Sequence, residues 1–280
     1  KRKQFRSGSN ESSLASEQCR AHREPGPDDL SEEGIEIASR ILLYGGTRGT
    51  GALLAKRLVA RGHQVRAVVR DAARRAGLPS GIDVVAGDLT QPETLRGAAS
   101  GMDALVFTAG VTRRPAGERV IKAVEYDGVR AALAAAQGDG FRGQVLYMTA
   151  LGVNRPSFMG WVLNRIKGNT LVWRRKAEEA IAASGFPYVI IRAGMLTDSP
   201  PGRRPVVLST GDQPLSLRTR VSRGDMAELF VHLLESGPGA RRVLEVVEGP
   251  GDGGTDWRRA LDEIGVVSPA QAGAHRRPRP

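Results

Sequence analysis

The stretch Ile41-Leu42-Leu43-Tyr44-Gly45-Gly46-Thr47-Arg48-Gly49-Thr50-Gly51 decides the fold of this chain. Its four leading apolar residues suit a parallel strand that is covered on both faces. The apolar pattern of residues 52–61 predicts a helix that ends at Gly62, and residues 63–69 read as a second, valine-rich strand. A strand, a glycine turn, a helix and a strand within roughly 30 residues are typical of a dinucleotide-binding unit.

The glycine-rich turn contains the residues that a pyrophosphate site needs. Gly45 suits a tight turn, Gly49 a close approach of backbone to phosphate, and Gly51 the packing of helix against strand. The free N–H groups of the helix and the positive end of its dipole favour an anion there. We predict cofactor contacts from the whole turn: Gly45, Gly46, Thr47, Arg48, Gly49, Thr50 and Gly51. The alternative is a tight turn in an unrelated α/β domain.

The end of the second strand indicates which dinucleotide is bound. Arg70 stands where NAD-specific sites normally place an acidic residue against the ribose 2'-hydroxyl. Its guanidinium can pair with a 2'-phosphate in a fork, and Arg48 can reach the same phosphate. We therefore expect a preference for NADP(H). NAD(H) is the alternative, because Asp71 can turn inward to the hydroxyl and Arg70 can equally be a solvated charge.

Two later strand ends supply further predicted cofactor contacts. Asp88 and Leu89 follow a strand over 82–86, where the carboxylate can bind the adenine amino group and the leucine can pack on the ring. The alternative for Asp88 is to cap the following turn. Small residues follow the strand over 103–107 at the expected switch point, where backbone must pass close to the riboses. These residues are Thr108, Ala109 and Gly110.

Composition narrows the class of protein. The 280 residues carry a formal charge of +11, but the arginines are scattered and no zinc pattern or RNP-like strand accompanies them. We therefore expect no nucleic-acid partner. The lone Cys19 rules out an internal disulfide framework. No apolar run approaches the roughly 18 residues of a membrane span, so we expect no membrane partner, and we expect no bound metal.

Strands and helices alternate along the rest of the chain. Further strands are expected over 144–148, 187–191, 206–208 and 243–247, and helices over 92–99, 118–137, 170–183, 223–234 and 256–264. This alternation predicts an α/β fold with a doubly wound parallel sheet, the Rossmann fold, and a small C-terminal substrate lobe at about 195–266. The domain is expected to span 39–266, between a disordered polar extension (1–38) and a disordered basic tail (267–280).

Two segments, 154–169 and 197–217, are expected to line the substrate. Residues 154–169 mix Phe158 and Trp161 with basic side chains and are expected to form part of the substrate wall. Residues 197–204 are rich in proline and glycine, which predicts a mobile lid over the site.

The ordered series of motifs resembles the atypical short-chain dehydrogenase/reductase family, in its NAD(P)-binding, NmrA-like branch. The resemblance covers roughly residues 40–265 and rests on Tyr44 to Gly51, Arg70, Asp88-Leu89, Thr108-Ala109-Gly110, Tyr126-Asp127-Gly128-Val129, Trp173 to Glu178, Ser184-Gly185 and Ile190 to Gly194. It implies that a lysine matching Lys176 bonds the nicotinamide ribose of NADP(H), and that Ala193 and Gly194 lie by the cofactor. The alternative for Lys176 is a surface charge.

The chain departs from this family at the proton donor. Tyrosine-dependent members have a tyrosine four residues before the lysine, and Val172 occupies that position. Thr149 or Ala150 matches the serine site, and a hydroxyl there can polarise a substrate carbonyl. Glu125 stands where many members have asparagine. The candidate catalytic residues are therefore Lys176 and Thr149.

Two functions agree with this pattern. The first is an NADPH-dependent oxidoreductase that transfers hydride to a carbonyl, quinone or flavin-like small molecule without the usual tyrosine. The second is a non-catalytic NADP(H) sensor or scaffold. We expect a cytoplasmic location, with organelle import by the N-terminal extension as the alternative. The alanine-rich helix over 118–137 can pack on the sheet or on a second copy, which leaves a homodimer open.

Overall fold

The computed structural model describes residues 38–265, apart from 112–115, 212 and 238–240. The polar extension up to residue 37 and the expected basic tail lie outside the described residues. None of the helices in the described ranges combines the length and the apolar character that crossing a bilayer requires.

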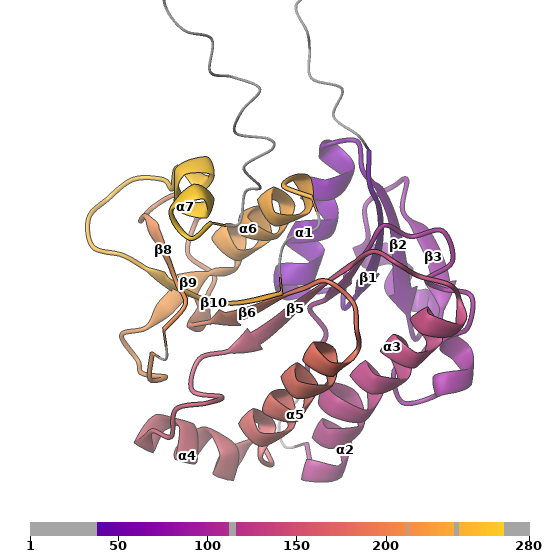
Figure 1. Ribbon diagram of the computed structural model, residues 1–280, viewed down its shortest axis with the longest axis horizontal. Coiled ribbons are helices and arrows are strands. Elements are labelled where there is room, and N and C mark those ends of the chain that lie inside the picture. The colour runs from indigo at the N-terminus through magenta and orange to yellow at the C-terminus, as the bar shows by residue number, and fades with distance from the viewer. Residues whose placement is uncertain (1–37, 112–115, 212, 238–240, 266–280) are drawn as a thin grey trace, which may run out of the picture. The chain divides into compact units, whose positions relative to one another are not determined.

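A sheet of eight strands forms the centre of the described domain, in the order β3-β2-β1-β4-β5-β6-β10-β8 (Figure 1). Its strands are β1 (Arg40–Tyr44), β2 (Gln64–Val69), β3 (Asp83–Ala86), β4 (Ala104–Phe107), β5 (Gln144–Ala150), β6 (Tyr188–Ala193), β8 (Val206–Ser209) and β10 (Arg242–Glu248). All neighbouring pairs are parallel except β10 with β8. The predicted doubly wound parallel sheet is confirmed, with an antiparallel edge strand added. The strand order reverses at β1 and β4, which makes their carboxyl ends the switch point.

Helices cover both faces of this sheet. They are α1 (Gly49–Ala60), α2 (Glu118–Lys122), α3 (Gly128–Gly138), α4 (Phe158–Ile166), α5 (Thr170–Ala183), α6 (Arg223–Glu235) and α7 (Trp257–Glu263). The helices α1 and α6 cover one face, and α3 and α5 cover the other (Figure 1).

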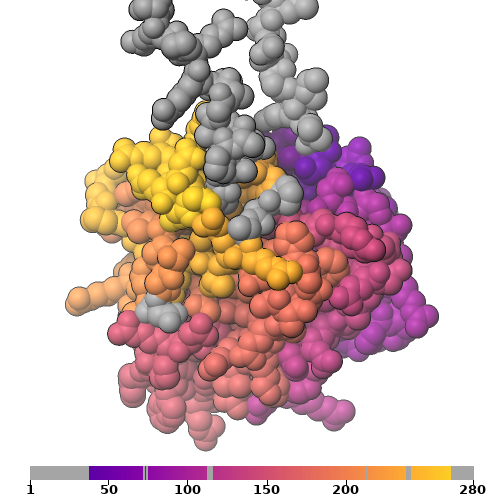
Figure 2. Space-filling model, viewed as in Figure 1, coloured from indigo at the N-terminus to yellow at the C-terminus, as the bar shows by residue number. Residues whose placement is uncertain are grey.

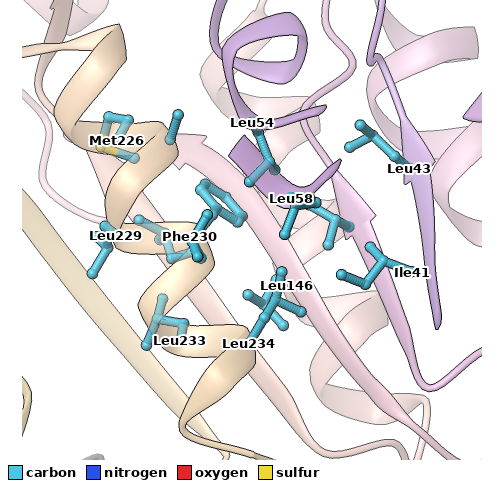
Figure 3. Packing of buried hydrophobic residues seen from close by; sticks show 14 of the residues in the cluster. Ile41, Leu43, Leu54, Leu58, Leu146, Met226, Leu229, Phe230, Leu233 and Leu234 are labelled. Carbon is cyan, nitrogen blue, oxygen red and sulfur yellow. The ribbon is translucent and has the colours of Figure 1, made fainter. Parts of the chain in front are cut away.

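The alternating side chains of β1 supply both apolar layers. Ile41 and Leu43 pack with α1 and α6, in the layer that Figure 3 shows, whereas Leu42 and Tyr44 pack with α3 and α5. All four side chains are buried. Burying an apolar side chain of this size contributes about 1.5–3 kcal/mol. The β1 strand is therefore fixed from both faces, and so is the turn that follows it.

The helix expected over 118–137 is interrupted by a π-helical turn. Residues Ala123–Asp127 form this turn between α2 and α3. Such insertions occur mostly as single turns and often at functional sites. The turn buries Glu125 beneath α5, and Gly128 follows it where a Cβ atom would lie 2.7 Å from the Cβ of Leu89. The alanine-rich sequence gives no sign of this insertion.

Other elements also differ from expectation. The segment 154–169, expected only as a wall, contains α4, whose N-cap Ser157 accepts a hydrogen bond from the Gly160 N–H at 3.0 Å. The helix expected over 92–99 is only a 3₁₀ turn, Pro92–Leu95. Within residues 195–222, β7 (Met195–Thr197) and β9 (Arg220–Ser222) pair in parallel as a separate small sheet.

Candidate active site

The turn between β1 and α1 lies directly against the end of β4. Gly45 has a φ of +97°, and a Cβ atom on it would lie 2.5 Å from the Ala109 nitrogen. A Cβ on Gly51 would collide with the Gly45 carbonyl oxygen and the Thr108 hydroxyl. The Thr108 N–H and hydroxyl both donate to the Tyr44 carbonyl, at 2.9 and 3.1 Å. Only glycine fits at positions 45 and 51, so the turn is locked to the switch point.

The N-terminus of α1 has the backbone N–H donors that an anion needs. The N-cap residue Arg48 makes no capping hydrogen bond with its side chain, and the first turn of α1 contains no acidic residue. The hydroxyl of Thr50 is buried and has no hydrogen-bond partner among the described residues. At Gly49, with φ +55°, an added Cβ would meet only Arg223, at 3.7 Å. The open space at Gly49, the Thr50 hydroxyl and the positive end of the helix dipole together fit the pyrophosphate of a dinucleotide.

A basic edge lies beside this turn at the end of β2. Arg70 and Arg75 are exposed, and Gly77 lies close to the Thr47 carbonyl, because a Cβ on Gly77 would be 3.4 Å from that oxygen. The carboxylate of Asp71 accepts from the Ala73 N–H at 2.9 Å and caps the 3₁₀ helix Ala72–Gly77. The Asp71 carboxylate therefore binds the backbone two residues farther along the chain.

Asp88 also caps its own turn. Its Oδ1 atom accepts from the N–H and the hydroxyl of Thr90, both at 2.9 Å. This is the alternative role that its sequence position allowed. Leu89 beside it is half-buried and packs in the layer beneath α3 and α5.

A buried carboxylate joins the end of β4 to α5. Glu125 is 3% exposed and accepts from the Thr170 hydroxyl at 2.5 Å, from Arg174 Nε at 3.1 Å and from the Val111 N–H at 3.1 Å. A Cβ on Gly110 would lie 3.2 Å from Arg174 Nη2 and 3.5 Å from Glu125 Oε1. The Arg174 cation is thus held next to the backbone of the switch point.

The charges of this cluster stabilise each other. Burial alone would raise the pKa of Glu125, but the charge of Arg174 and three hydrogen bonds outweigh it and lower the pKa. Burial alone would lower the pKa of Arg174, but the Glu125 carboxylate outweighs it and raises the pKa. Both groups therefore stay ionised at neutral pH.

The residues of α5 that contact the buried Glu125 are not Val172 and Lys176 of the family motif. Thr170 and Arg174 are four residues apart, so they share the helix face that meets Glu125. Lys176 is exposed, and its Nζ lies 4.9 Å from the centroid of the Trp173 ring. Val172 is 43% exposed. The motif residues Val172 and Lys176 therefore each lie two positions after Thr170 and Arg174, the pair that contacts Glu125.

A second buried charge network underlies the expected substrate walls. On β6, Arg192 pairs with Glu178 of α5 at 2.8 Å and lies 3.9 Å from Glu245 of β10. With its amide oxygen toward the guanidinium, Asn154 lies 2.6 Å from Arg192 Nη2. Glu245 accepts from the Gln213 N–H at 2.8 Å. Burial raises the pKa of Glu178, and the attraction of Arg192 only partly offsets this.

The other predicted residues lie at the ends of β5 and β6. Thr149 is 2% exposed and pairs in register with Arg192. The Ala193 carbonyl accepts from the Leu151 N–H at 2.9 Å. A Cβ on Gly194 would lie 2.7 Å from the Thr219 carbonyl oxygen. Gly194, at the end of β6, is therefore packed closely against the residue that precedes β9.

The sequence analysis did not single out Thr170 and Arg174, the two residues of α5 that contact Glu125. The basic run Arg174-Arg175-Lys176 offers three candidate cations, and the choice among them depends on the exact phase of α5. Only the contacts with Glu125 fix that phase. Within the described residues, no group of three or more His, Cys, Asp or Glu side chains is arranged to hold a metal ion.

This fold and this turn define a Rossmann-type dinucleotide-binding protein. The chain belongs to the NAD(P)H-binding family, whose model matches residues 45–237. The assignment agrees with the resemblance to the atypical short-chain dehydrogenase/reductases.

Two relatives and a solved structure are similar to this chain over most of its length. Sanguinarine reductase of Eschscholzia californica is 29% identical over 263 residues, covering 80% of this chain and 95% of the relative. An uncharacterised chloroplastic protein of Arabidopsis thaliana is 31% identical over 238 residues, covering 77% of this chain and 71% of the relative. The crystal structure of the oxidoreductase ylbE from Lactococcus lactis matches with a TM-score of 0.65 at 18% identity, covering 80% of this chain and 96% of that one. The last likeness concerns the fold alone.

Proposed function

We propose that the protein is an NADPH-dependent reductase of quinone-like acceptors. The observation that carries this proposal is the Arg174 cation, which Glu125 holds next to Gly110 at the switch point. Bound NADPH supplies a hydride. Hydride addition to a quinone gives a hydroquinone anion with a negative charge on oxygen. Arg174 stabilises that charge, and water supplies the one proton that completes the reduction. The sanguinarine reductase relative supports a reductase.

The residues on α5 favour a quinone over a simple ketone. Reduction of a ketone needs a proton donor for the forming alkoxide, which is the task of the family's tyrosine. Arg174 cannot release its proton, because Glu125 raises its pKa further. Thr170 directs its hydroxyl proton to Glu125 at 2.5 Å. An acceptor whose reduced anion takes its proton from water suits this arrangement better.

The basic edge supports NADPH over NADH. Arg70 is exposed at the end of β2 and Arg48 at the start of α1, so both can pair with a 2'-phosphate. Asp71, the residue that would favour NADH, caps the next turn instead. The Lys176 side chain lies over Trp173, so we assign the interaction with the nicotinamide end to Arg174.

Turnover with matched variants tests the reductase. We expect NADPH oxidation with quinones and little with aldehydes. Arg174→Ala should lower kcat/KM by about 10²–10³, the usual loss of one preorganised charge, and Arg174→Lys should restore part of it. Arg175→Ala is the control, because Arg175 pairs with Glu179 on the exposed side of the helix. Equal effects of the Arg174 and Arg175 substitutions would contradict the proposed role.

The second candidate is a non-catalytic NADP(H) sensor. It is favoured by Val172 at the family's donor position and by the hydrogen bond that commits the neighbouring Thr170 hydroxyl to Glu125. Tight NADPH binding without oxidation across quinones, flavins and aldehydes would select the sensor.

The cellular location belongs to the proposal as well. The relative from Arabidopsis is described as chloroplastic, so organelle import stands beside the cytoplasm. Import assays with and without residues 1–37 distinguish the two.

A further inference from the structure

An apolar surface lies on the outer side of α4. Phe158, Trp161 and Ile166 are 79%, 63% and 56% exposed, and the first two rings stack with their centroids 6.1 Å apart. Their spacing places them on one half of the helix, while Met159 and Leu163 pack inward. In the view of Figures 1 and 2, α4 lies at the lower edge of the described domain. Large apolar side chains gathered on a surface mark an interaction site.

The loop 213–219 extends this surface. The Ser157 hydroxyl, at the start of α4, donates to the Leu215 carbonyl at 3.4 Å, and Leu215 belongs to the apolar cluster that Met159 joins. Leu217, two residues farther along the loop, is 62% exposed. We name the surface formed by Phe158, Trp161, Ile166 and Leu217 the α4 patch.

The α4 patch is set in a cationic part of the chain. Residues 144–177 contain no Asp or Glu, and Arg155, Arg165 and Lys167 lie on α4 or next to it in the sequence. Arg165 is exposed on the outer half of α4, and Arg218 is exposed beside Leu217. The nearby acid Glu118 accepts hydrogen bonds from Asn169 and Trp173 at 3.0 and 3.1 Å. Exposed apolar and positively charged side chains therefore occur together, without free acids on α4 itself.

We propose that the α4 patch docks the protein on an anionic lipid bilayer. Aromatic rings at the level of the headgroups, flanked by arginines that face phosphates, are the combination that holds proteins at membrane interfaces. A second copy of the chain fits less well, because a symmetric contact would bring two cationic segments together. The expectation of no membrane partner considered only spanning segments. The proposal does not depend on the quinone reductase activity.

Cosedimentation of the full chain with vesicles tests the docking. We expect binding to phosphatidylcholine vesicles that contain phosphatidylglycerol, and about tenfold weaker binding to phosphatidylcholine alone. Phe158→Ser with Trp161→Ser should weaken binding to the anionic vesicles about tenfold or more. Arg165→Glu with Arg218→Glu should remove the preference for anionic lipid. The control Val207→Ser alters an exposed apolar residue on β8 and should bind like the parent.

Two kinds of result would overturn the docking proposal. One is that the parent does not bind anionic vesicles, or that the variant with Phe158→Ser and Trp161→Ser binds them as tightly as the parent. The other is a dimer in sedimentation velocity that Trp161→Ser dissociates, which would assign the α4 patch to self-association. An unchanged NADPH affinity in each variant shows that the domain remains folded, and this readout is independent of lipid.

Discussion

At the scale of single residues, Gly45 shows how closely the cofactor turn depends on backbone conformation. Alanine at this position would have to adopt φ +97° with its Cβ 2.5 Å from the Ala109 nitrogen. We expect Gly45→Ala to lower the free energy of unfolding by about 1–3 kcal/mol or more and to weaken NADPH binding. Gly140→Ala is the control, because Gly140 has φ +75° with open space around it. Urea unfolding in which Gly45→Ala costs no more than Gly140→Ala would contradict the close approach.

Glu125 gives a prediction for the pH dependence of stability. Its pKa is lower in the folded protein than in the unfolded chain, where it is about 4.3. The carboxylate therefore contributes stability above that value, and the contribution is lost as the pH falls through the folded pKa. Glu125→Gln should remove this acid-limb dependence and cost about 3–5 kcal/mol at neutral pH, because Arg174 loses its counter-charge. Unfolding free energies of Glu125→Gln and the exposed control Glu118→Gln, compared across the acid range, decide the matter. If the stability of Glu125→Gln fell with decreasing pH as steeply as that of the parent protein, the role of Glu125 would be contradicted.

At the scale of elements, local patterns predicted what depends on neighbouring residues alone. The strand, turn and helix from Ile41 onward follow from apolar periodicity and from glycine positions, and the structure has them there. The π turn Ala123–Asp127 and the phase of α5 did not follow from the sequence. Both depend on Glu125, whose partners Thr170 and Arg174 are about 45 residues away in the chain. A contact between residues so far apart in the chain cannot be predicted from a local sequence pattern.

The packing of α3 on the loop after β3 is also testable. A methyl group on Gly128 would lie 2.7 Å from the Cβ of Leu89, so Gly128→Ala should lower stability by about 1–3 kcal/mol through overpacking. Gly138→Ala at the end of α3 has open space around it and should be neutral or stabilising. Thermal unfolding compares the two, and equal behaviour would argue against the contact.

At the scale of the whole molecule, Arg192 connects the sheet to both expected substrate walls. Asn154 approaches it from the segment after β5, and Gln213 is held by its neighbour Glu245. Arg192→Met should cost about 3–5 kcal/mol, because buried carboxylates lose their counter-charge. The milder Arg192→Lys should raise the acceptor KM while leaving NADPH affinity near the parental value. Steady-state kinetics with a quinone give the KM of the acceptor and of NADPH separately. A change in the KM of NADPH alone would contradict the assignment of these walls.

Topology was predictable at this scale, because alternating strands and helices leave few ways to build a parallel sheet. The C-terminal lobe was less predictable. Its strands β7 and β9 have three residues each and are far apart in sequence, so their pairing has no periodic signal. The same holds for the exposed side of α4, where apolar residues occur on both faces of the helix.

The central claim is that the turn after β1 and the basic edge at Arg70 form an NADPH site. The most direct measurement is a fluorescence titration of the full chain and of Arg70→Ala with NADPH and NADH. The account predicts that the parent binds NADPH more tightly than NADH. Arg70→Ala should lose about tenfold for NADPH, the value of one charge-assisted contact of about 1.4 kcal/mol, and change little for NADH. Failure to bind either nucleotide, or a preference for NADH that Arg70→Ala leaves unchanged, would contradict it.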